Sequence, residues 1–387
     1  MIDKLDYSKC TLCASCLNGC PHNCIAFNKE KDSFLYPQID YSKCTGCGLC
    51  EKKCPVLTPS AQRGVYKNVY AVINKDEEVR LKSSSGGVFS AIAEYILTKG
   101  GVVFGAAFDE NFQVKHISVR KSADLHKIRG SKYVQSDIGK TYTEVKKLLI
   151  EGRLVLFSGC PCQVQALKQY LDKPYENLYT VDFICHGIGS QITFDNYLLS
   201  LESEYKSKAK VFSFRDKING WHLFSVKVEF ENGKTFTRPC VYDTYMRGYF
   251  EYIFLKKACH DCPAKDFKSG SDVTMADYWG ANVVEKKLDD DKGLSLCIVN
   301  TQKGEKLLKS IDTNILKWDT DYSKAISYNK SLLQSFPPSA KRKQFFDLIS
   351  SVGYTKAFDR VCKEKKMIVY KRIVRKRLGF IKKILSR

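Results

Sequence analysis

The sequence predicts an α/β protein, α+β overall, in which a mixed-sheet domain lies between a small cysteine-rich domain and a basic helical tail. Three observations support this fold class. A cysteine-rich sequence near the N-terminus occurs twice, strand and helix patterns alternate through the middle of the chain, and the C-terminal residues are basic with helical periodicity. At 387 residues the chain is long enough for two or three domains. We place them at residues 1–56, 66–340 and 341–387.

The N-terminal domain contains an internal repeat. The sequence DYSKCT occurs at residues 6–11 and again at residues 40–45, and each copy continues into a cysteine-rich loop. Strand-like stretches at residues 24–27 and 34–36 lie between the copies, so we expect a small domain with two-fold symmetry. Residues 57–65 contain Pro, Ser, Gln and Gly, a composition typical of a linker.

The middle of the chain alternates between apolar strand-like runs and amphipathic helical stretches. Strands are predicted at residues 69–74, 101–107, 154–158 and 179–184, and helices at residues 88–97, 141–150 and 163–171. This alternation indicates a sheet that is at least partly parallel. Farther on, apolar and polar residues alternate from 224 to 230, and the following Asn232-Gly233 predicts a hairpin turn.

Seventeen cysteines set this chain apart from an ordinary globular protein. The first ten residues contain no apolar core of a signal peptide, so we expect a cytoplasmic protein whose thiols stay reduced. Reduced thiols favour metal binding over a disulfide framework. No apolar run of about 18 residues occurs, so no membrane-spanning helix is expected.

Eight of the cysteines form two copies of the motif C-x2-C-x2-C-x3-C-P. The copies are Cys10, Cys13, Cys16 and Cys20, followed by Cys44, Cys47, Cys50 and Cys54. This spacing matches bacterial two-cluster ferredoxins, in which three thiolates of one motif hold a [4Fe-4S] cluster and the fourth binds the other cluster. The match assigns Cys54 to the first cluster and Cys20 to the second, and it leaves Cys24 without a ligand role. Structural zinc sites use separated C-x2-C pairs, which do not fit a triple repeat.

A third set of four cysteines lies in the larger domain. One predicted strand runs into Gly159-Cys160-Pro161-Cys162 and another into Cys185-His186-Gly187. If the strands are parallel neighbours, both turns lie at the edge where open α/β sheets bind ligands. A C-x2-C pair follows much later, so the proposed set is Cys162, Cys185, Cys259 and Cys262. These residues can hold either a third cluster or zinc, and Cys160 remains a rival to Cys162.

A serine- and glycine-rich turn precedes the predicted helix at 88–97. Residues 83–87 read SSSGG, and backbone N–H groups and hydroxyls before a helix form a natural cradle for phosphate. A second cationic turn, residues 129–133, can add to the same anion site. The alternative is a capped helix with a glycine-rich entry.

Several stretches together resemble the beta-subunit family of coenzyme F420 hydrogenase/dehydrogenase over roughly residues 1 to 285. They are SSSGGVFSAIAEYIL, VVFGAAF, RGSKYVQS, FSGCPCQVQAL, DFICHGIGS, FRDK with Gly220-Trp221, YMRGYF, CHDCPAKDF and DVTMADYWG. The resemblance implies a flavin enzyme in which FAD lies beside a [4Fe-4S] cluster. It carries the cluster role to Cys162, Cys185, Cys259 and Cys262. The implied FAD contacts are Ser85, Gly86, Gly87, Ser131, Lys132 and Tyr133.

The function implied is that of a flavin-dependent oxidoreductase. A ferredoxin or similar donor is expected to pass electrons through the clusters to FAD and on to an organic substrate, with His186, Lys132 and Asp277 as weak catalytic candidates. Members of the wider family are encoded among polysaccharide-synthesis genes, which makes a small molecule or a lipid-linked glycan a candidate substrate. The alternative is a non-catalytic electron-transfer subunit of a larger complex. Neither the use of F420 nor the substrate can be read from the residues.

The net charge of +21 is concentrated at the C-terminus, where residues 363–387 contain eleven Lys or Arg and one acid. Their apolar residues fall on one helical face, so the tail can lie on an anionic membrane surface, at the inner face of the membrane. A helix packed on its own domain with a solvated basic face is the alternative. Nucleic-acid binding is not expected, because no nucleic-acid module accompanies the charge.

Overall fold

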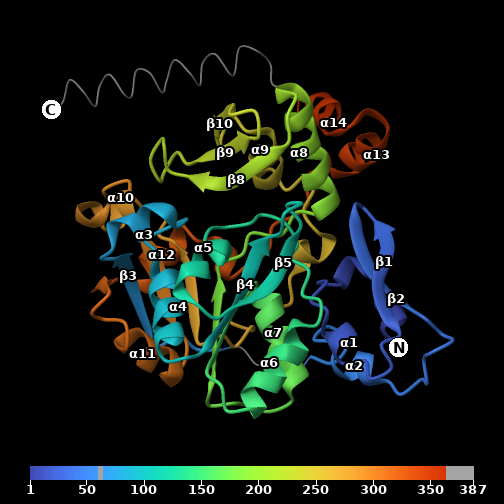
Figure 1. Cartoon of the computed structure of the whole chain (residues 1–387), viewed down its shortest axis with the longest axis horizontal. Coiled ribbons are helices and arrows are strands. Elements are labelled where there is room, and N and C mark those ends of the chain that lie inside the picture. Colours follow the sequence, from blue (N-terminus) through green and yellow to red (C-terminus); the bar gives the residue numbers. More distant parts are fainter. Residues whose placement is uncertain (60–63, 363–387) are drawn as a thin grey trace.

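The computed structural model describes residues 1–59 and 64–362 (Figure 1). The predicted tail is therefore described only to residue 362, and its basic stretch at 363–387 lies outside the described residues. Within the described part, helices α13 (Arg342–Val352) and α14 (Tyr354–Val361) confirm that the chain after residue 340 is helical. None of the helices in the described ranges has the length and apolar character needed to cross a bilayer.

The largest element is an eight-stranded mixed sheet (Figure 1). In spatial order its strands are β13 (Ile315–Asp319), β3 (Asn68–Asn74), β12 (Ser295–Val299), β11 (Val273–Asp277), β7 (Leu178–Phe183), β6 (Val155–Ser158), β4 (Val102–Phe108) and β5 (Val114–Val119). Strands β4, β6, β7 and β11 are parallel, and their outer neighbours β5 and β12 pair antiparallel. The four strands predicted in this region are confirmed, each end within one residue of its expected place.

Helices cover both faces of this sheet. Helix α4 (Val88–Thr98) packs on one face, whereas α6 (Thr141–Ile150) and α7 (Pro161–Leu171) pack on the other. Successive side chains of β6 point to opposite faces of the sheet: Leu156 lies in the α4 cluster and Phe157 in the α6–α7 cluster. All three predicted helices are confirmed, although α7 begins earlier than expected because proline suits the first turn of a helix.

The N-terminal cysteine-rich part rests against α6 and α7 (Figure 1). It contains the short helices α1 (Ser15–Asn18) and α2 (Leu49–Lys52) and the antiparallel strands β1 (Ile25–Lys31) and β2 (Phe34–Ile39). Asn18 Nδ2 donates a hydrogen bond to Gly139 O at 2.8 Å, and Gln169 Nε2 donates one to Lys52 O at 2.9 Å. Polar contacts therefore attach the cysteine loops to the helices of the larger sheet.

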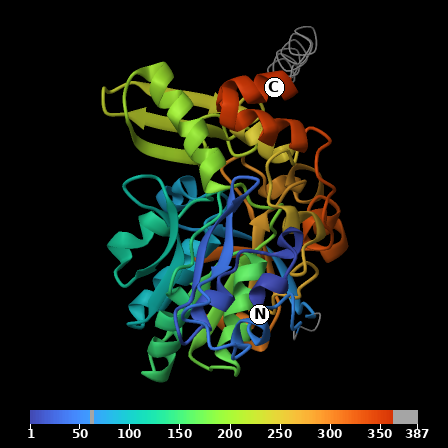
Figure 2. The same cartoon turned by 90° about the vertical axis from the view of Figure 1, so that its right-hand side faces the viewer.

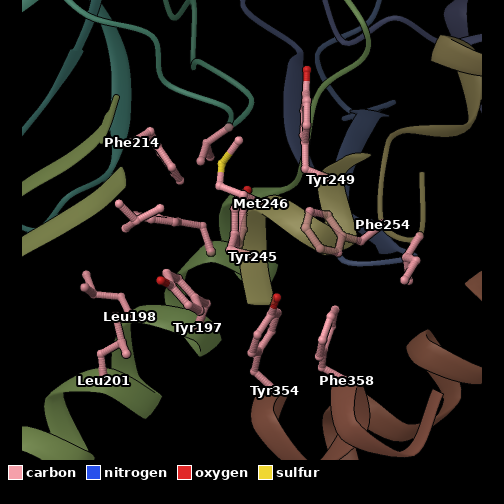
Figure 3. Packing of buried hydrophobic residues seen from close by; sticks show 14 of the residues in the cluster. Tyr197, Leu198, Leu201, Phe214, Tyr245, Met246, Tyr249, Phe254, Tyr354 and Phe358 are labelled. Atoms are coloured by element: carbon pink, nitrogen blue, oxygen red, sulfur yellow. The ribbon is translucent and has the colours of Figure 1, made fainter. Parts of the chain in front are cut away.

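A second, three-stranded sheet lies beyond the end of the large one (Figures 1 and 2). Its strands are β8 (Ala209–Asp216), β9 (Ser225–Phe230) and β10 (Thr235–Pro239), and Gly233 has a φ of +79° in the predicted hairpin turn. Helices α8 (Gln191–Tyr205), α9 (Thr244–Phe250), α13 and α14 pack with this sheet around the largest aromatic cluster (Figure 3).

Five shorter helices complete the α-helices of residues 1–59 and 64–362. They are α3 (Glu77–Lys82), α5 (Leu125–Ile128), α10 (Ala281–Val284), α11 (Gln302–Lys309) and α12 (Tyr322–Ser327). Helix α11 joins α4 on its face of the large sheet through Leu307 and Leu308.

We predict that Phe194→Ala lowers the free energy of unfolding by about 4 kcal/mol, because it opens a cavity in the aromatic cluster. Phe194 on α8 is 0% exposed and packs against Phe108, Phe212 and Phe214. Leu199→Ala on the same helix is the matched control: Leu199 is 60% exposed, so a change within about 0.5 kcal/mol is expected. Urea unfolding of both variants tests this, and a loss below about 1 kcal/mol for Phe194→Ala would contradict the packing.

Candidate iron–sulfur and flavin site

The eight cysteines of the two N-terminal motifs differ in their surroundings. One small cavity is lined by Cys20, Cys44, Cys47 and Cys50, together with Cys24. The other four, Cys10, Cys13, Cys16 and Cys54, are all buried; burial raises the pKa of the Cys13 and Cys16 thiols, and the nearby Cys10 and Cys54 raise both further. Gly46 and Gly48, both with a φ of +72°, turn the second loop in a conformation that side chains disfavour.

Cys24, which the motif left without a role, lies against the second group. Its Sγ is 3.3 Å from the Sγ of Cys20. In the described part of the chain, no three His, Cys, Asp or Glu side chains converge as they would around a single metal ion. The second group instead lines a small cavity together with Cys24, and the ligand roles of the individual thiols in both groups remain predictions.

The third set of cysteines also lines one cavity. Strands β6 and β7 pair in parallel from Val155 with Leu178 to Ser158 with Val181, so both cysteine turns lie at the same sheet edge. The cavity there is lined by Cys162, Cys185, Cys259 and Cys262. Cys259 is supplied by a 3₁₀ helix, η4 (Lys257–Asp261), and Cys262 follows it directly.

Cys160 does not line this four-cysteine cavity. Its thiol hydrogen-bonds to Cys162 and Cys185, and this contact lowers the pKa of Cys185 to about 6 although burial opposes the shift. Cys160 is also the N-cap of α7: its sulfur accepts from the Gln163 N–H, and its own N–H donates to Gln163 Oε1 at 2.9 Å. The geometry therefore favours Cys162 over Cys160 as the fourth member of the set.

A second, larger cavity of about 320 Å³ connects the cysteine edge with the serine–glycine turn. It is lined by five of the six residues to which the resemblance gives FAD contacts, namely Ser85, Gly87, Ser131, Lys132 and Tyr133. Cys160, Cys185 and His186 line its other end. Gly86 is the exception, because it packs onto β3 and β12: a Cβ atom there would lie 2.3 Å from Val72 O.

The two predicted anion-binding turns meet in the wall of this cavity. Ser131 N donates to Ser84 Oγ at 2.8 Å, and the two hydroxyl oxygens lie 3.0 Å apart. Gly87, with a φ of +87°, precedes α4, so the N-terminal N–H groups of this 11-residue helix open beside the same turn. Hydroxyls, backbone donors and a helix N-terminus are the groups that bind diphosphate.

Arg215 holds the cavity wall together, and sequence analysis assigned it no role beyond its place in the FRDK stretch. It makes two hydrogen bonds to the Asp277 carboxylate, at 2.8 and 2.9 Å, and further ones to Tyr133 Oη at 3.0 Å and Ser84 O at 2.8 Å. Trp221 Nε1 donates to Asp277 as well, at 2.8 Å. The three-stranded sheet is thereby joined to the carboxyl end of β11.

The three catalytic candidates differ in how they are engaged. The Asp277 carboxylate is occupied by Arg215 and Trp221, which makes it a structural anchor. Lys132 Nζ donates to Lys127 O and Arg129 O, and burial lowers the pKa of this lysine to about 7. His186 contacts Ser331 Oγ through Nδ1 at 2.9 Å, and burial lowers its pKa to about 4. All three residues line the larger cavity.

Two buried donors in the cavity wall lack a protein acceptor. Among the described residues, Gln163 Nε2 and Arg215 Nε have no hydrogen-bond partner, and both side chains line the cavity. Buried donors without acceptors are costly in a folded protein, so a bound acceptor is expected there. An isoalloxazine ring offers carbonyl and ring-nitrogen acceptors, and the donor set therefore fits a flavin.

His116 is a buried histidine in the same wall. Its Nε2 lies 3.0 Å from Ser158 O, its Nδ1 contacts Ser136 Oγ, and its ring stacks on Phe157. Burial lowers the pKa of His116 to about 4. The neutral ring thus supports the end of β6, immediately before the cysteine turn.

We predict that His116 makes the protein less stable as the pH falls below about 6.5. The unfolded chain binds a proton on this histidine between pH 6.5 and 4, whereas the folded chain does not, which costs about 2 kcal/mol between pH 7 and pH 5. His116→Gln should remove this part of the pH dependence in urea unfolding, and the exposed His126→Gln should retain it. Equal slopes for wild type and His116→Gln would show that the folded chain protonates His116.

Comparisons with known proteins place the chain in a family. A 4Fe-4S dicluster domain model matches residues 9–57, and models of the N-terminal and C-terminal parts of the coenzyme F420 hydrogenase/dehydrogenase beta subunit match residues 69–141 and 152–320. No curated protein matches significantly. Among solved structures, a chain of the F420-reducing [NiFe] hydrogenase complex from Methanosarcina barkeri aligns with a TM-score of 0.47 and 18% identity, over 74% of this chain and 95% of that chain. The two beta-subunit models together span well over half of the sequence, and the chain belongs to the coenzyme F420 hydrogenase/dehydrogenase beta-subunit family, with a 4Fe-4S dicluster domain at its N-terminus.

Proposed function

We propose that this chain is an iron–sulfur flavoprotein oxidoreductase that passes electrons from a ferredoxin-type donor through [4Fe-4S] clusters to FAD and on to an organic acceptor. One observation carries the proposal: the four-cysteine cavity and the larger cavity share a wall. Cys185 and Gly187 line both of them. A cluster in the first and a flavin ring in the second would be close neighbours.

The residues for a flavin divide into two groups. Ser84, Ser131 and the N-terminus of α4 suit the diphosphate, and the free donors of Gln163 and Arg215 suit the ring. A flavin accepts single electrons and can deliver a hydride, which is the chemistry a one-electron chain needs at its end. Tyr249, whose hydroxyl donates to Gly187 O at 2.9 Å, and Tyr133 close the aromatic side of the cavity.

The N-terminal thiols suggest where electrons enter. Cys47, in the second group, is exposed, as are its neighbours Thr45 and Gly46. The first group faces inward: Cys13 packs in the α6–α7 core cluster, and the first turn of α7 contains Cys162. A donor that docks at the loop around Cys47 would therefore reach the second group first.

The proposal extends to the acceptor only as a class. Small molecules or lipid-linked glycans of polysaccharide synthesis are the first acceptors to assay. A second candidate function is a non-catalytic electron-transfer subunit, which the family's name as a beta subunit favours. The isolated chain, given reduced ferredoxin, should reduce an organic acceptor in the first case and only artificial dyes in the second.

We predict about 12 irons, matching acid-labile sulfide and one FAD per chain after oxygen-free purification, since three cubanes contain four irons each. Cys162→Ala should contain about 8 irons, whereas Cys160→Ala should keep about 12, because Cys160 lies outside the four-cysteine cavity. Iron, sulfide, zinc and flavin analyses on the same samples measure this. Zinc in place of four irons, or the absence of flavin absorbance, would contradict the proposed function.

A further inference from the structure

Lys256 is a buried lysine at the junction between the N-terminal loops and the third set of cysteines. It is 1% exposed and immediately precedes η4, the 3₁₀ helix that carries Cys259. Its Nζ donates to Thr11 O and, at 2.7 Å, to Gln135 Oε1. Thr11 directly follows Cys10 in the first cysteine loop. One side chain therefore joins the peptide of that loop to the segment that supplies Cys259.

The charge of Lys256 has no carboxylate beside it. Within residues 1–59 and 64–362, both described partners of Nζ are neutral oxygens. Burying an ammonium group without an anion costs several kcal/mol, so a counter-charge is expected nearby. A [4Fe-4S] cluster held by four thiolates would supply that counter-charge, because such a cluster carries a net negative charge. Lys256 lies between two predicted cysteine sets, since it donates to the residue after Cys10 and precedes the 3₁₀ helix that carries Cys259.

The geometry points to Lys256 as a positioning residue that holds the first N-terminal cluster beside the third cluster and, through its ammonium charge, favours the reduction of both. This inference rests on the proposed function, because it requires clusters in both sets. It also gives an order for electron transfer. Electrons enter at the group around Cys47 and pass to the group that contains Cys10. From there they cross at Lys256 to the group that contains Cys162.

The physical basis is electrostatic. Each transfer oxidises one centre and reduces the next by one electron, with no bond made or broken, and the reduced centre gains one negative charge. A positive charge in a buried site stabilises that gain far more than it would in water. Hydrogen bonds and local charge are the means by which a protein sets cluster potentials. Other lysines are placed differently: Lys265 donates to Cys185 O and Ser331 O, on the side of the third set alone.

The test compares Lys256→Met, Lys256→Arg and Lys257→Met in the full chain with its cofactors loaded. Lys257→Met removes the same charge one residue away, at a side chain that is 41% exposed and paired with Asp32. Redox titration followed by electron paramagnetic resonance gives the potential of each cluster. For Lys256→Met we expect the reduction equilibrium of two of the three clusters to weaken at least about tenfold, which is about 59 mV for a one-electron couple. Lys256→Arg and Lys257→Met should stay near wild type.

Unchanged potentials in a Lys256→Met protein that keeps about 12 irons would overturn the inference while leaving the proposed function intact. A wild-type chain with about 8 irons would instead contradict the third cluster, and with it the proposed function. If Lys256→Met loses iron, Lys256→Gln supplies an uncharged side chain that still donates hydrogen bonds. In the wild type, the reduced first and third clusters should also broaden each other's spectra. Isolated, uncoupled signals from both would count against their placement on either side of Lys256.

Discussion

Strand β6 pairs with β7 in parallel, and the candidate site depends on that pairing more than on any other contact. Parallel neighbours end at the same edge of a sheet, so the turns after Ser158 and after Phe183 must emerge together. Cys162 lies in the first turn of α7, directly after the first of these turns, and Cys185 lies in the second. An antiparallel arrangement would place these thiols at opposite edges of the sheet. Cys259 and Cys262 could then not line one cavity with both of them. The buried aliphatic residues of both strands hold the register, because a slip by one residue would turn them toward the wrong face.

Around that edge the larger cavity is closed by parts of the chain that are distant in sequence. Arg215 comes from the three-stranded sheet, Ser84 from the turn before α4, and Asp277 from the end of β11. A buried arginine needs its carboxylate, since either charge alone would be costly inside the protein. The ion pair is therefore an obligatory contact. It holds the aromatic side of the cavity, including Tyr133, over the serine–glycine turn. The same network explains why Asp277 is poorly suited to proton transfer.

Polar contacts join the N-terminal cysteine loops to the rest of the protein, in addition to the apolar packing of Cys13 and Ala14 in the α6–α7 cluster. Asn18, Gln169 and Lys256 each connect a backbone carbonyl or amide of one part with the other part. Directional contacts of this kind set orientation more precisely than apolar packing does, and orientation matters where electrons must cross between two centres. The exposure of Cys47 and the burial of Cys13 give the small domain an outer and an inner end.

Sequence alone determined those features whose signals are local. Periodicity predicted the central strands β4, β6 and β7 and the helices α4, α6 and α7, and the motif spacing predicted that Cys20 lies with Cys44, Cys47 and Cys50, which line one cavity together. Tertiary structure decided the rest: the antiparallel outer strands β12 and β13, the position of Cys162 and not Cys160 in the wall of the four-cysteine cavity, the withdrawal of Gly86 from the larger cavity, and the contacts of Arg215 and Lys256. The physical reason is the separation in sequence between the residues that interact. A helical or strand pattern is set by residues within a few positions of one another, whereas Lys256 meets Thr11 across 245 residues and only the folded chain brings them together.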